Sequence, residues 1–137
     1  MNKIRGFTLV ELMLVVIIIG VLIAMVAPRL AGRSEQARIA CAKADIESNI
    51  SVALDLYELD NSKYPTTEQG LEALMHKPSG YPEPKNWNGP YLKKTPVDPW
   101  GNSYQYRSPG TNNKDYDLYS FGPDGTEGTD DITNWQM

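Results

Sequence analysis

Cysteine is nearly absent from this 137-residue sequence, and several catalytic signatures are missing altogether. The single cysteine, Cys41, excludes a disulfide within the chain. The single histidine, His76, stands before Lys77-Pro78, where a helix end or a surface position suits it better than a role as a base. No glycine-rich phosphate loop is present, and no serine has the surroundings of a nucleophile elbow. An enzyme is therefore the class of function that the sequence favours least.

Basic residues are also scarce, above all near the C-terminus. Residues 115–137 contain six acids and no lysine or arginine, and the whole chain has a formal net charge of −4. Binding to nucleic acid depends on lysine and arginine that neutralise phosphates. We therefore expect no nucleic-acid partner.

A long apolar run near the N-terminus contrasts with the polar remainder. Leu12 to Ala27 carries no charge, and extension back to Phe7 adds only Thr8 and Glu11 as polar residues. At about 1.5 Å per residue, a helix from Phe7 to Ala27 is about 31 Å long. This length matches a hydrocarbon core of about 30 Å, so residues 7–27 are predicted to cross a membrane. The remaining residues, 28–137, are predicted to form a globular domain.

Three interpretations of this N-terminal segment were considered. A secretory signal peptide fits the charged start, but the run is long and no small-x-small cleavage site follows it. A plain signal anchor would keep Lys3 and Arg5 in the cytoplasm and place the C-terminal domain outside. Neither interpretation explains the stretch GFTLVE, in which a glycine precedes an aromatic residue and an acid stands inside the apolar run.

GFTLVE resembles the processing site of type IV pilin-like prepilins, and the positions that match are Gly6, Phe7 and Glu11. The resemblance implies that residues 1–6 are a leader peptide and that a prepilin peptidase cuts between Gly6 and Phe7. It also implies methylation of the new amine of Phe7. The mature chain would then begin at Phe7.

Glu11 is an unusual residue for a segment that enters a bilayer. A carboxylate within the bilayer costs on the order of a few kcal/mol, so it is normally kept for a partner. Cleavage creates such a partner, the positive amine of Phe7, which a neighbouring subunit could offer in a filament core of low dielectric constant. The alternative is that Glu11 lies near the lipid headgroups and is simply solvated. We interpret Glu11 as an assembly residue and not as a catalytic one.

The helix is predicted to continue beyond the membrane, from Phe7 to about Leu59, with Pro28 as a point where it kinks or loosens. Its second half carries an apolar stripe with steps of three or four residues, which predicts an amphipathic helix packed on the C-terminal domain. The stripe consists of Ile39, Ala42, Ile46, Ile50, Ala53 and Tyr57.

Downstream of the long helix, Thr66 and Gln69 have the spacing of a capping box, and they predict a short helix that ends near Met75. Strands are predicted at Tyr91–Lys93, Ser103–Arg107 and Tyr116–Ser120. The expected fold is therefore of the α+β class. A long N-terminal helix, half transmembrane and half amphipathic, packs on a small three-stranded antiparallel sheet, as in type IV pilin-like proteins.

Three C-terminal segments, YPTTEQGLEAL, GPYLKKTPVDPWGNSYQYRSPG and YDLYSFGPDGTEGTDDITNW, closely resemble the major pseudopilins of type II secretion systems. The resemblance implies a homopolymer, a pseudopilus in the periplasm, whose assembly drives export of folded proteins across the outer membrane. It implies insertion in the lipid of the inner membrane of a Gram-negative bacterium, with a periplasmic C-terminal domain. The partners that it implies are minor pseudopilins, the prepilin peptidase, the inner-membrane assembly platform and, indirectly, the outer-membrane secretin.

The same resemblance implies a calcium ion in the loop after the last strand, where true type IV pilins usually close a loop with a disulfide. Asp124, Asp130 and Asp131 are the side chains that it implies as ligands, and the carbonyls of Phe121 and Thr126 are further candidates. The residue types agree, because calcium takes six to eight oxygen ligands and tolerates irregular loops. The spacing is not that of an EF-hand, and an acidic turn with solvated charges is the alternative.

Two other functions remain as alternatives. A type IV pilin for adhesion or motility would share the leader and helix, but the chain lacks the cysteine pair for the usual disulfide. A membrane-anchored domain could bind sugar or peptide through its aromatic residues, although anchoring core and loops is the commoner role of such side chains. Such an anchor needs neither Glu11 nor the GFTLVE site.

Overall fold

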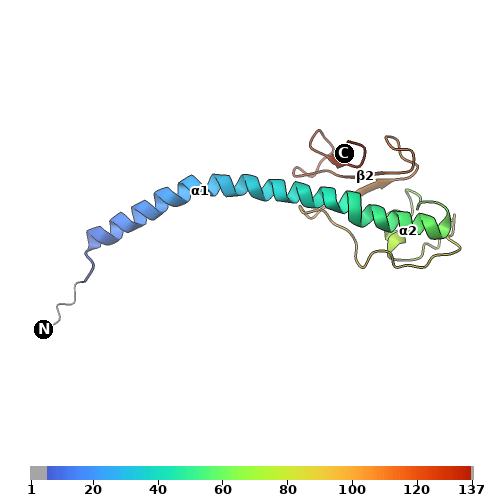
Figure 1. The fold of residues 1–137 in the computed structure, drawn as a ribbon, viewed down its shortest axis with the longest axis horizontal. Coiled ribbons are helices and arrows are strands. Elements are labelled where there is room, and N and C mark those ends of the chain that lie inside the picture. Colours follow the sequence, from blue (N-terminus) through green and yellow to red (C-terminus); the bar gives the residue numbers. More distant parts are fainter. Residues whose placement is uncertain (1–5, 137) are drawn as a thin grey trace. The chain divides into compact units, whose positions relative to one another are not determined.

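The computed structural model describes residues 6–136, so leader residues 1–5 and Met137 lie outside the described part of the chain (Figure 1). Its contacts divide the chain into two compact units, Met1–Ala37 and Arg38–Met137. Of the described residues, the first unit contains the short segment before the helix and the first part of the helix, which includes its apolar run. The second contains the rest of the helix and all the strands, and it holds the hydrophobic core. The predicted membrane boundary at Pro28 stays a prediction.

Three consecutive helical segments replace the single helix expected from Phe7 to Leu59. They are α1 (Leu9–Ala44), a π-helical turn η1 (Asp45–Ile50) and α2 (Ser51–Asn61). Pro28 lies inside α1 without ending it. The last turn closes at Ser62, a left-handed residue with φ 63° whose N–H donates to the carbonyl of Glu58. Helical structure thus begins two residues later and ends two residues later than predicted.

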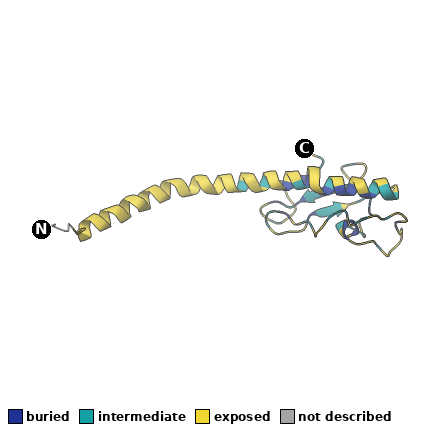
Figure 2. Cartoon of the chain, turned by 60° about the horizontal axis from the view of Figure 1, so that its bottom comes forward, coloured by how far each residue is buried: buried dark blue, intermediate teal, exposed yellow. Residues whose placement is uncertain are grey.

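The predicted apolar stripe forms the helical side of the core. Five of its six members are buried, and Ile39 is partly buried against the same cluster. Leu54, which the stripe did not include, is fully buried as well. Tyr104, Leu118 and Ile132 join the core from the sheet and its flanks, and Ala73 and Leu74 join it from the segment after the long helix. Figure 2 shows the result in α2, where one face is buried and the opposite face is exposed.

The π-helical turn lies in the middle of this packed face. A π turn leaves local carbonyls without their usual α-helical donors, and here the hydroxyl of Ser51 donates to the carbonyl of Glu47. The Asn49 amide binds Asp45 Oδ1 at 2.6 Å, one helical turn away. The wide turn therefore has side-chain donors of its own.

Three tyrosine hydroxyls connect the helix to the rest of the second unit. Each comes from a different segment and donates to a carboxylate on the helix. The pairs are Tyr104 with Asp45 at 2.9 Å, Tyr64 with Asp55 at 3.0 Å, and Tyr91 with Asp60 at 2.7 Å. We call these contacts the tyrosine–aspartate pairs. They spread over sixteen residues of the helix, from Asp45 to Asp60, and so cover most of its packed face.

The sheet is three-stranded and antiparallel, as predicted, and its strand order is β1-β2-β3. The strands are β1 (Gln105–Arg107), β2 (Asp117–Ser120) and β3 (Ile132–Thr133). The first two lie within the predicted ranges Ser103–Arg107 and Tyr116–Ser120. The third pairs Thr133 with Tyr119 and Ile132 with Ser120.

The predicted strand at Tyr91–Lys93 is wrong, and the short helix before it is different in kind. The N–H groups of Tyr91 and Leu92 both donate to the carbonyl of Leu74, at 2.7 and 3.2 Å, so this backbone binds a helix end and not a strand. That helix is a 3₁₀ turn, η2 (Leu71–Leu74). The predicted capping box precedes it, with Thr66 N bound to Gln69 Oε1 and Gln69 N bound to Thr66 Oγ1.

Candidate functional site

The predicted cleavage site lies just before the helix. Gly6, Phe7 and Thr8 are exposed and non-helical, and α1 begins at the next residue. The side chain of Phe7 is 82% exposed. A peptidase must bind the scissile peptide in an extended form, which a bond inside a helix cannot offer without unwinding. The Gly6–Phe7 bond therefore has the accessibility that processing requires.

Glu11 has a partner within its own chain, which the sequence reasoning missed. Glu11 Oε2 accepts from the N–H of Thr8 at 2.9 Å and from the Thr8 hydroxyl at 3.0 Å. The Thr8 hydroxyl in turn accepts from the N–H of Glu11 at 3.2 Å. This is a capping box with Thr8 as N-cap, and the T-L-V-E spacing is its signature. The pairing joins the processing site to the first turn of α1.

The capping box uses only one of the two oxygens of the Glu11 carboxylate. Both Thr8 donors bind the same atom, Oε2, so Oε1 can accept a hydrogen bond from another group. Phe7, whose amine is the partner expected after cleavage, is the residue next to the N-cap. The geometry is therefore compatible with both a local role and an assembly role for Glu11.

The stem that follows has the length and composition of a membrane-crossing helix. Among residues 6–136, one continuous helical stretch, Leu9–Asn61, passes that test, with a mean hydropathy of 3.1 over its most apolar 18-residue window. No residue of that window is buried within the chain. Its side chains therefore have their surfaces available for lipid or for other helices.

The second predicted site, the acidic loop, begins directly after β2. Gly122 has φ 72°, and a Cβ at this position would lie 2.6 Å from the carbonyl oxygen of Asp130. Only glycine permits this close approach together with a positive φ. The beginning and the end of the loop thus meet, and residues 123–129 form a closed excursion between β2 and β3.

Two of the three predicted carboxylates converge within this loop. Asp131 Oδ1 accepts from the N–H of Gly128 at 3.1 Å. Asp130 Oδ1 lies near the same glycine, 3.3 Å from the place that a Cβ would take if Gly128 had one. The Asp124 carboxylate instead accepts from Thr126, from the N–H of Thr126 at 2.9 Å and from the Thr126 hydroxyl at 3.0 Å. Phe121 and Thr126, whose carbonyls are predicted as further calcium ligands, lie in the same loop. The structure does not bring all five predicted ligand residues to one point.

The acids of the loop repel one another. Burial and the negative charges of Asp130, Glu127 and Asp124 together raise the pKa of the Asp131 carboxyl, although the N–H of Gly128 acts against this. The predicted metal-ligand atoms are all hard oxygens, which suits calcium. Within the described residues, however, no three carboxylate, cysteine or histidine side chains are grouped so that they could hold a metal ion as they stand. Calcium binding here stays a prediction.

Two buried aspartates that the sequence analysis did not single out organise the ends of these strands. Asp98 accepts from the N–H groups of Trp100 and Asn102, and its Oδ2 accepts from the Ser120 hydroxyl at 2.7 Å. Ser120 Oγ then accepts from the N–H of Gly122 at 3.1 Å. The buried chain from Asp98 to Gly122 therefore ties the entrance of the acidic loop to a distant turn.

Asp117, at the start of β2, has a similar function for another loop. It is 3% exposed, and it accepts from the backbone N–H groups of Thr111, Asn112 and Asn113. Burial alone would raise the pKa of the Asp117 carboxyl, but the N–H groups of Asn113, Asn112 and Thr111 outweigh it and hold the pKa below its usual value. Asp117 is thus a charged centre around which residues 111–113 fold.

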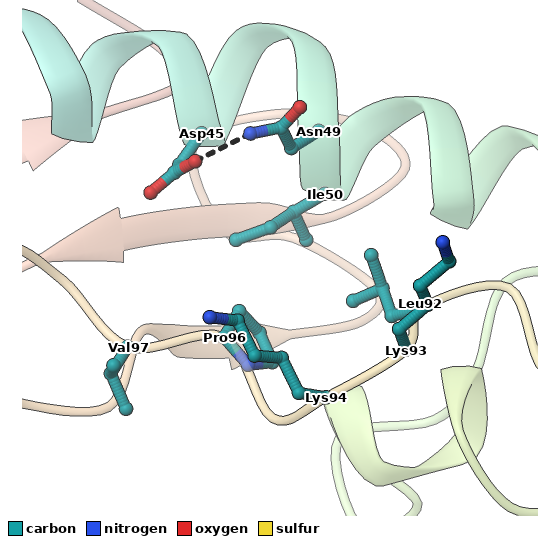
Figure 3. Close-up of a pocket in the computed structure, with 8 residues that line it drawn as sticks. All are labelled: Asp45, Asn49, Ile50, Leu92, Lys93, Lys94, Pro96 and Val97. Carbon is teal, nitrogen blue, oxygen red and sulfur yellow. Dashed lines mark hydrogen bonds between the residues drawn. The ribbon is translucent and has the colours of Figure 1, made fainter.

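A recess of about 390 Å³ lies beside the π-helical turn (Figure 3). Its walls are Asp45, Asn49 and Ile50 on one side and residues from 92 to 97 on the other. Asp45 is already held by Tyr104 and Asn49. The charged residues that line the recess are Asp45, Lys93 and Lys94.

Comparison with known proteins adds two family matches. Residues 29–135 match the family described as type II secretion system (T2SS), protein G. Residues 1–27 match the prokaryotic N-terminal methylation motif. The second match spans the predicted leader, cleavage site and membrane segment, and the first spans the globular part.

Individual relatives agree over almost the whole length. The type II secretion system core protein G of Pseudomonas aeruginosa is 57% identical over 135 residues, which cover 95% of this chain and 94% of that protein. The protein of the same name from Escherichia coli K12 is 52% identical, with 99% and 94% covered. A crystal structure of the major pseudopilin from the type 2 secretion system of enterohaemorrhagic Escherichia coli superposes with a TM-score of 0.70, at 45% identity, over 80% of this chain and 96% of that one.

Proposed function

Because this chain belongs to the family of type II secretion system protein G, we propose that it is the major subunit of a pseudopilus whose polymerisation drives export of folded proteins across the outer membrane. The observation that carries this proposal is the agreement of relatives with this name over nearly the full chain. The family role is structural, and the subunit has no chemistry of its own to perform. A type IV pilin for adhesion or motility is not favoured.

The N-terminus supports a sequence of events for maturation. The precursor enters the inner membrane with residues 1–6 in the cytoplasm, and a prepilin peptidase cuts the exposed Gly6–Phe7 bond. Methylation of the Phe7 amine follows, in keeping with the matched motif. The apolar stem of α1 then holds the processed subunit in the bilayer, and the C-terminal unit lies in the periplasm.

Assembly replaces lipid around the stem by the stems of other subunits. In the monomer, the capping box satisfies Glu11 through Thr8, so the carboxylate has a local partner while the stem is still in lipid. In the filament, the Glu11 carboxylate also pairs with the positive Phe7 amine of a neighbouring subunit. The proposed partners in this process are the minor pseudopilins, the assembly platform and, indirectly, the secretin.

Calcium completes the acidic loop in our proposal. Asp130 and Asp131 already converge at Gly128, and a cation there would offset the repulsion from Asp130, Glu127 and Asp124 that adds to burial in raising the pKa of Asp131. The Asp124 carboxylate and the carbonyls of Phe121 and Thr126 would supply the other oxygens. For this, the Asp124 side chain would rotate away from the N–H and hydroxyl of Thr126 that it now binds. Because the metal binds the closed loop and not the unfolded chain, its binding free energy becomes folding free energy.

Complementation tests the proposed function directly. The chain is expressed in an Escherichia coli or Pseudomonas aeruginosa strain that lacks its own core protein G but keeps the rest of its secretion system. We expect restored release of the exported enzymes into the medium, and antibody-labelled filaments when the chain is overproduced. Filaments that restore surface adhesion or motility but not secretion would instead support the pilin alternative.

A further inference from the structure

The outer face of α2 carries an apolar stripe that nothing in the monomer covers. Val52, Leu56 and Leu59 are 54%, 46% and 75% exposed. Their spacing of four and three residues puts them on one side of the helix, away from the buried residues Ala53, Leu54 and Tyr57. Contiguous exposed apolar side chains on a surface helix commonly mark a contact site. We call these three residues the outer stripe.

The helical segment that carries the outer stripe is strongly acidic. Residues 44–62 contain five carboxylates and no lysine or arginine. Asp55 and Asp60 lie beside the stripe by helical spacing, and each already accepts a tyrosine hydroxyl from its own chain. A partner for this face should therefore bring an apolar or aromatic group together with positive charge.

Such a combination occurs in the loop that carries Tyr81. At 95% exposure, the Tyr81 side chain is more exposed than any other large apolar residue of the described chain. Lys77, Lys85 and Glu83 are the charged residues of the loop between 77 and 88, so its net charge is positive. Because Lys77 pairs with Glu83 at 3.2 Å, Lys85 is left as the excess charge.

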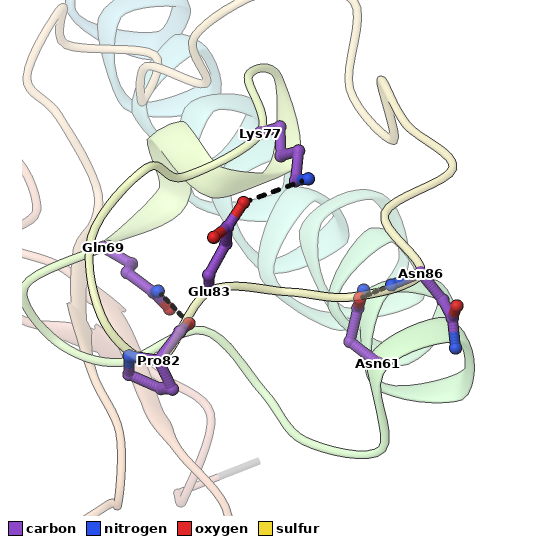
Figure 4. Close-up of polar contacts among 6 residues, drawn as sticks. All are labelled: Asn61, Gln69, Lys77, Pro82, Glu83 and Asn86. Atoms are coloured by element: carbon purple, nitrogen blue, oxygen red, sulfur yellow. Dashed lines mark hydrogen bonds and ion pairs between the residues drawn. The ribbon is translucent and has the colours of Figure 1, made fainter.

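The loop holds Tyr81 in place although the ring itself touches little. Figure 4 shows two contacts made by the backbone that follows Tyr81. Gln69 Nε2 donates to the carbonyl of Pro82 at 2.8 Å, and the N–H of Asn86 donates to Asn61 Oδ1 at 3.2 Å. An exposed ring on a backbone that is already fixed loses little freedom when a partner covers it, which favours binding.

We propose that Tyr81 of one subunit packs on the outer stripe of the next subunit in the filament. The inference rests on the proposed function, because it takes the partner to be a second copy of this chain. The two surfaces are different parts of the molecule, so the contact is heterologous, and such contacts generate open helical assemblies instead of closed dimers. The excess positive charge of the loop then faces the acidic helix.

Cysteine cross-linking of the full chain tests the contact. In a Cys41→Ser background, Leu59→Cys and Tyr81→Cys are introduced together, and filaments in cells with the complete secretion system are exposed to a mild oxidant. We expect a ladder of dimers, trimers and longer species on a non-reducing gel. Either variant alone should stay monomeric, and a mixture of the two single variants should give dimers only.

Any of three results would overturn the contact. A ladder from Leu59→Cys with Lys114→Cys, an exposed control position, but not with Tyr81→Cys would place a different surface on the stripe. Dimers from Tyr81→Cys alone, or its attachment to a different protein, would show that Tyr81 meets another partner. Filaments without any ladder would refute the contact but keep the proposed function, whereas the absence of filaments from the parent chain would refute the function.

A second measurement separates a contact from a fold defect. Tyr81→Ala should lower the amount of filament about five- to tenfold, whereas Tyr81→Phe, which keeps the ring, should assemble normally. The melting temperature of the detergent-solubilised monomer should be the same for both, because the ring is exposed. Equal filament amounts for Tyr81→Ala and the parent chain would contradict the inference.

Discussion

Replacement of Asp117 by asparagine should strongly destabilise the C-terminal unit. Oδ2 of Asp117 accepts from Thr111 N at 2.8 Å, and Oδ1 accepts from Asn113 N at 2.8 Å. An asparagine must place an NH₂ group at one of these positions. Because both positions face an N–H donor, neither orientation of the amide avoids two donors pointing at each other.

The size of this effect follows from the number of bonds. Hydrogen bonds to a charged group contribute about 1.5–3 kcal/mol each, and an unsatisfied buried donor costs about 1–3 kcal/mol. Thr111 and Asn112 are exposed, so water replaces part of what is lost. We expect a decrease in the free energy of unfolding of about 3 kcal/mol for Asp117→Asn. For a unit of this size, this corresponds to a melting temperature lower by about 10–20 °C.

Thermal unfolding of the full-length protein in detergent, followed by circular dichroism, measures this change. Asp115→Asn is the matched control, because Asp115 is an exposed acid two residues away and its substitution should change stability by less than about 0.5 kcal/mol. If Asp117→Asn and Asp115→Asn melt at the same temperature, then the hydrogen bonds around Asp117 do not organise the loop and our reasoning is wrong.

The pH dependence gives a second readout of the same carboxylate. The N–H donors keep the pKa of Asp117 lowered in the folded protein, against about 3.9 in an unfolded chain. Its contribution to stability is therefore fully present above about pH 4 and is lost as the pH falls through the folded pKa. Asp117→Asn should remove this part of the acid-induced loss, whereas Asp115→Asn should leave it unchanged.

Three further predictions concern maturation, assembly and metal. Gly6→Ala should block cleavage, so that a gel shows only the precursor, while Gly80→Ala, at an exposed glycine outside the site, should mature normally; mature product from Gly6→Ala would disprove the prepilin interpretation. Glu11→Ala should give a processed, membrane-inserted subunit that forms few filaments, and Thr8→Ala, which removes only the capping hydroxyl, should assemble better; normal filaments from Glu11→Ala would remove its assembly role. Asp124→Ala with Asp131→Ala should lower the melting temperature of the full-length protein in detergent and abolish its rise on calcium addition, with Glu127→Ala as the neighbouring control; a parent chain whose melting curve ignores both calcium and a chelator would refute the metal site.

The sequence predicted those parts of the fold that depend on one continuous periodicity. The stripe from Ile39 to Tyr57 was correct because burial of one helix face imposes spacings that no other structure shares. The capping box at Thr66 and Gln69 was also correct, since its two hydrogen bonds involve only neighbours in sequence. The same signature occurs at Thr8 and Glu11, where a membrane-entering acid also has a second explanation through its charge.

Features that depend on distant partners were not predictable in this way. Tyr91–Lys93 has the composition of a strand, but its backbone N–H groups are used by the carbonyl of Leu74, seventeen residues earlier. Strand β3 is only two residues long, so it has no alternation to recognise, and it exists because Ser120 and Tyr119 provide a register. In the acidic loop, the residue types indicate calcium, whereas the contact of Gly122 with Asp130 appears only in three dimensions.

The tyrosine–aspartate pairs have a consequence for the conditions that the subunit can tolerate. Each donor is a neutral hydroxyl, so added salt screens these contacts far less than it would screen ion pairs between exposed charges. Burial first, and then the hydrogen bond from Tyr104 to Asp45, raises the pKa of the Tyr104 hydroxyl, and the same causes act on Tyr64 with Asp55. The contribution of the pairs to stability is therefore fully present below about pH 10 and fades only as the pH rises through the raised pKa values. The contacts that hold residues 45–60 of the helix against the rest of the second unit are therefore less sensitive to salt and to mild alkali than exposed ion pairs would be.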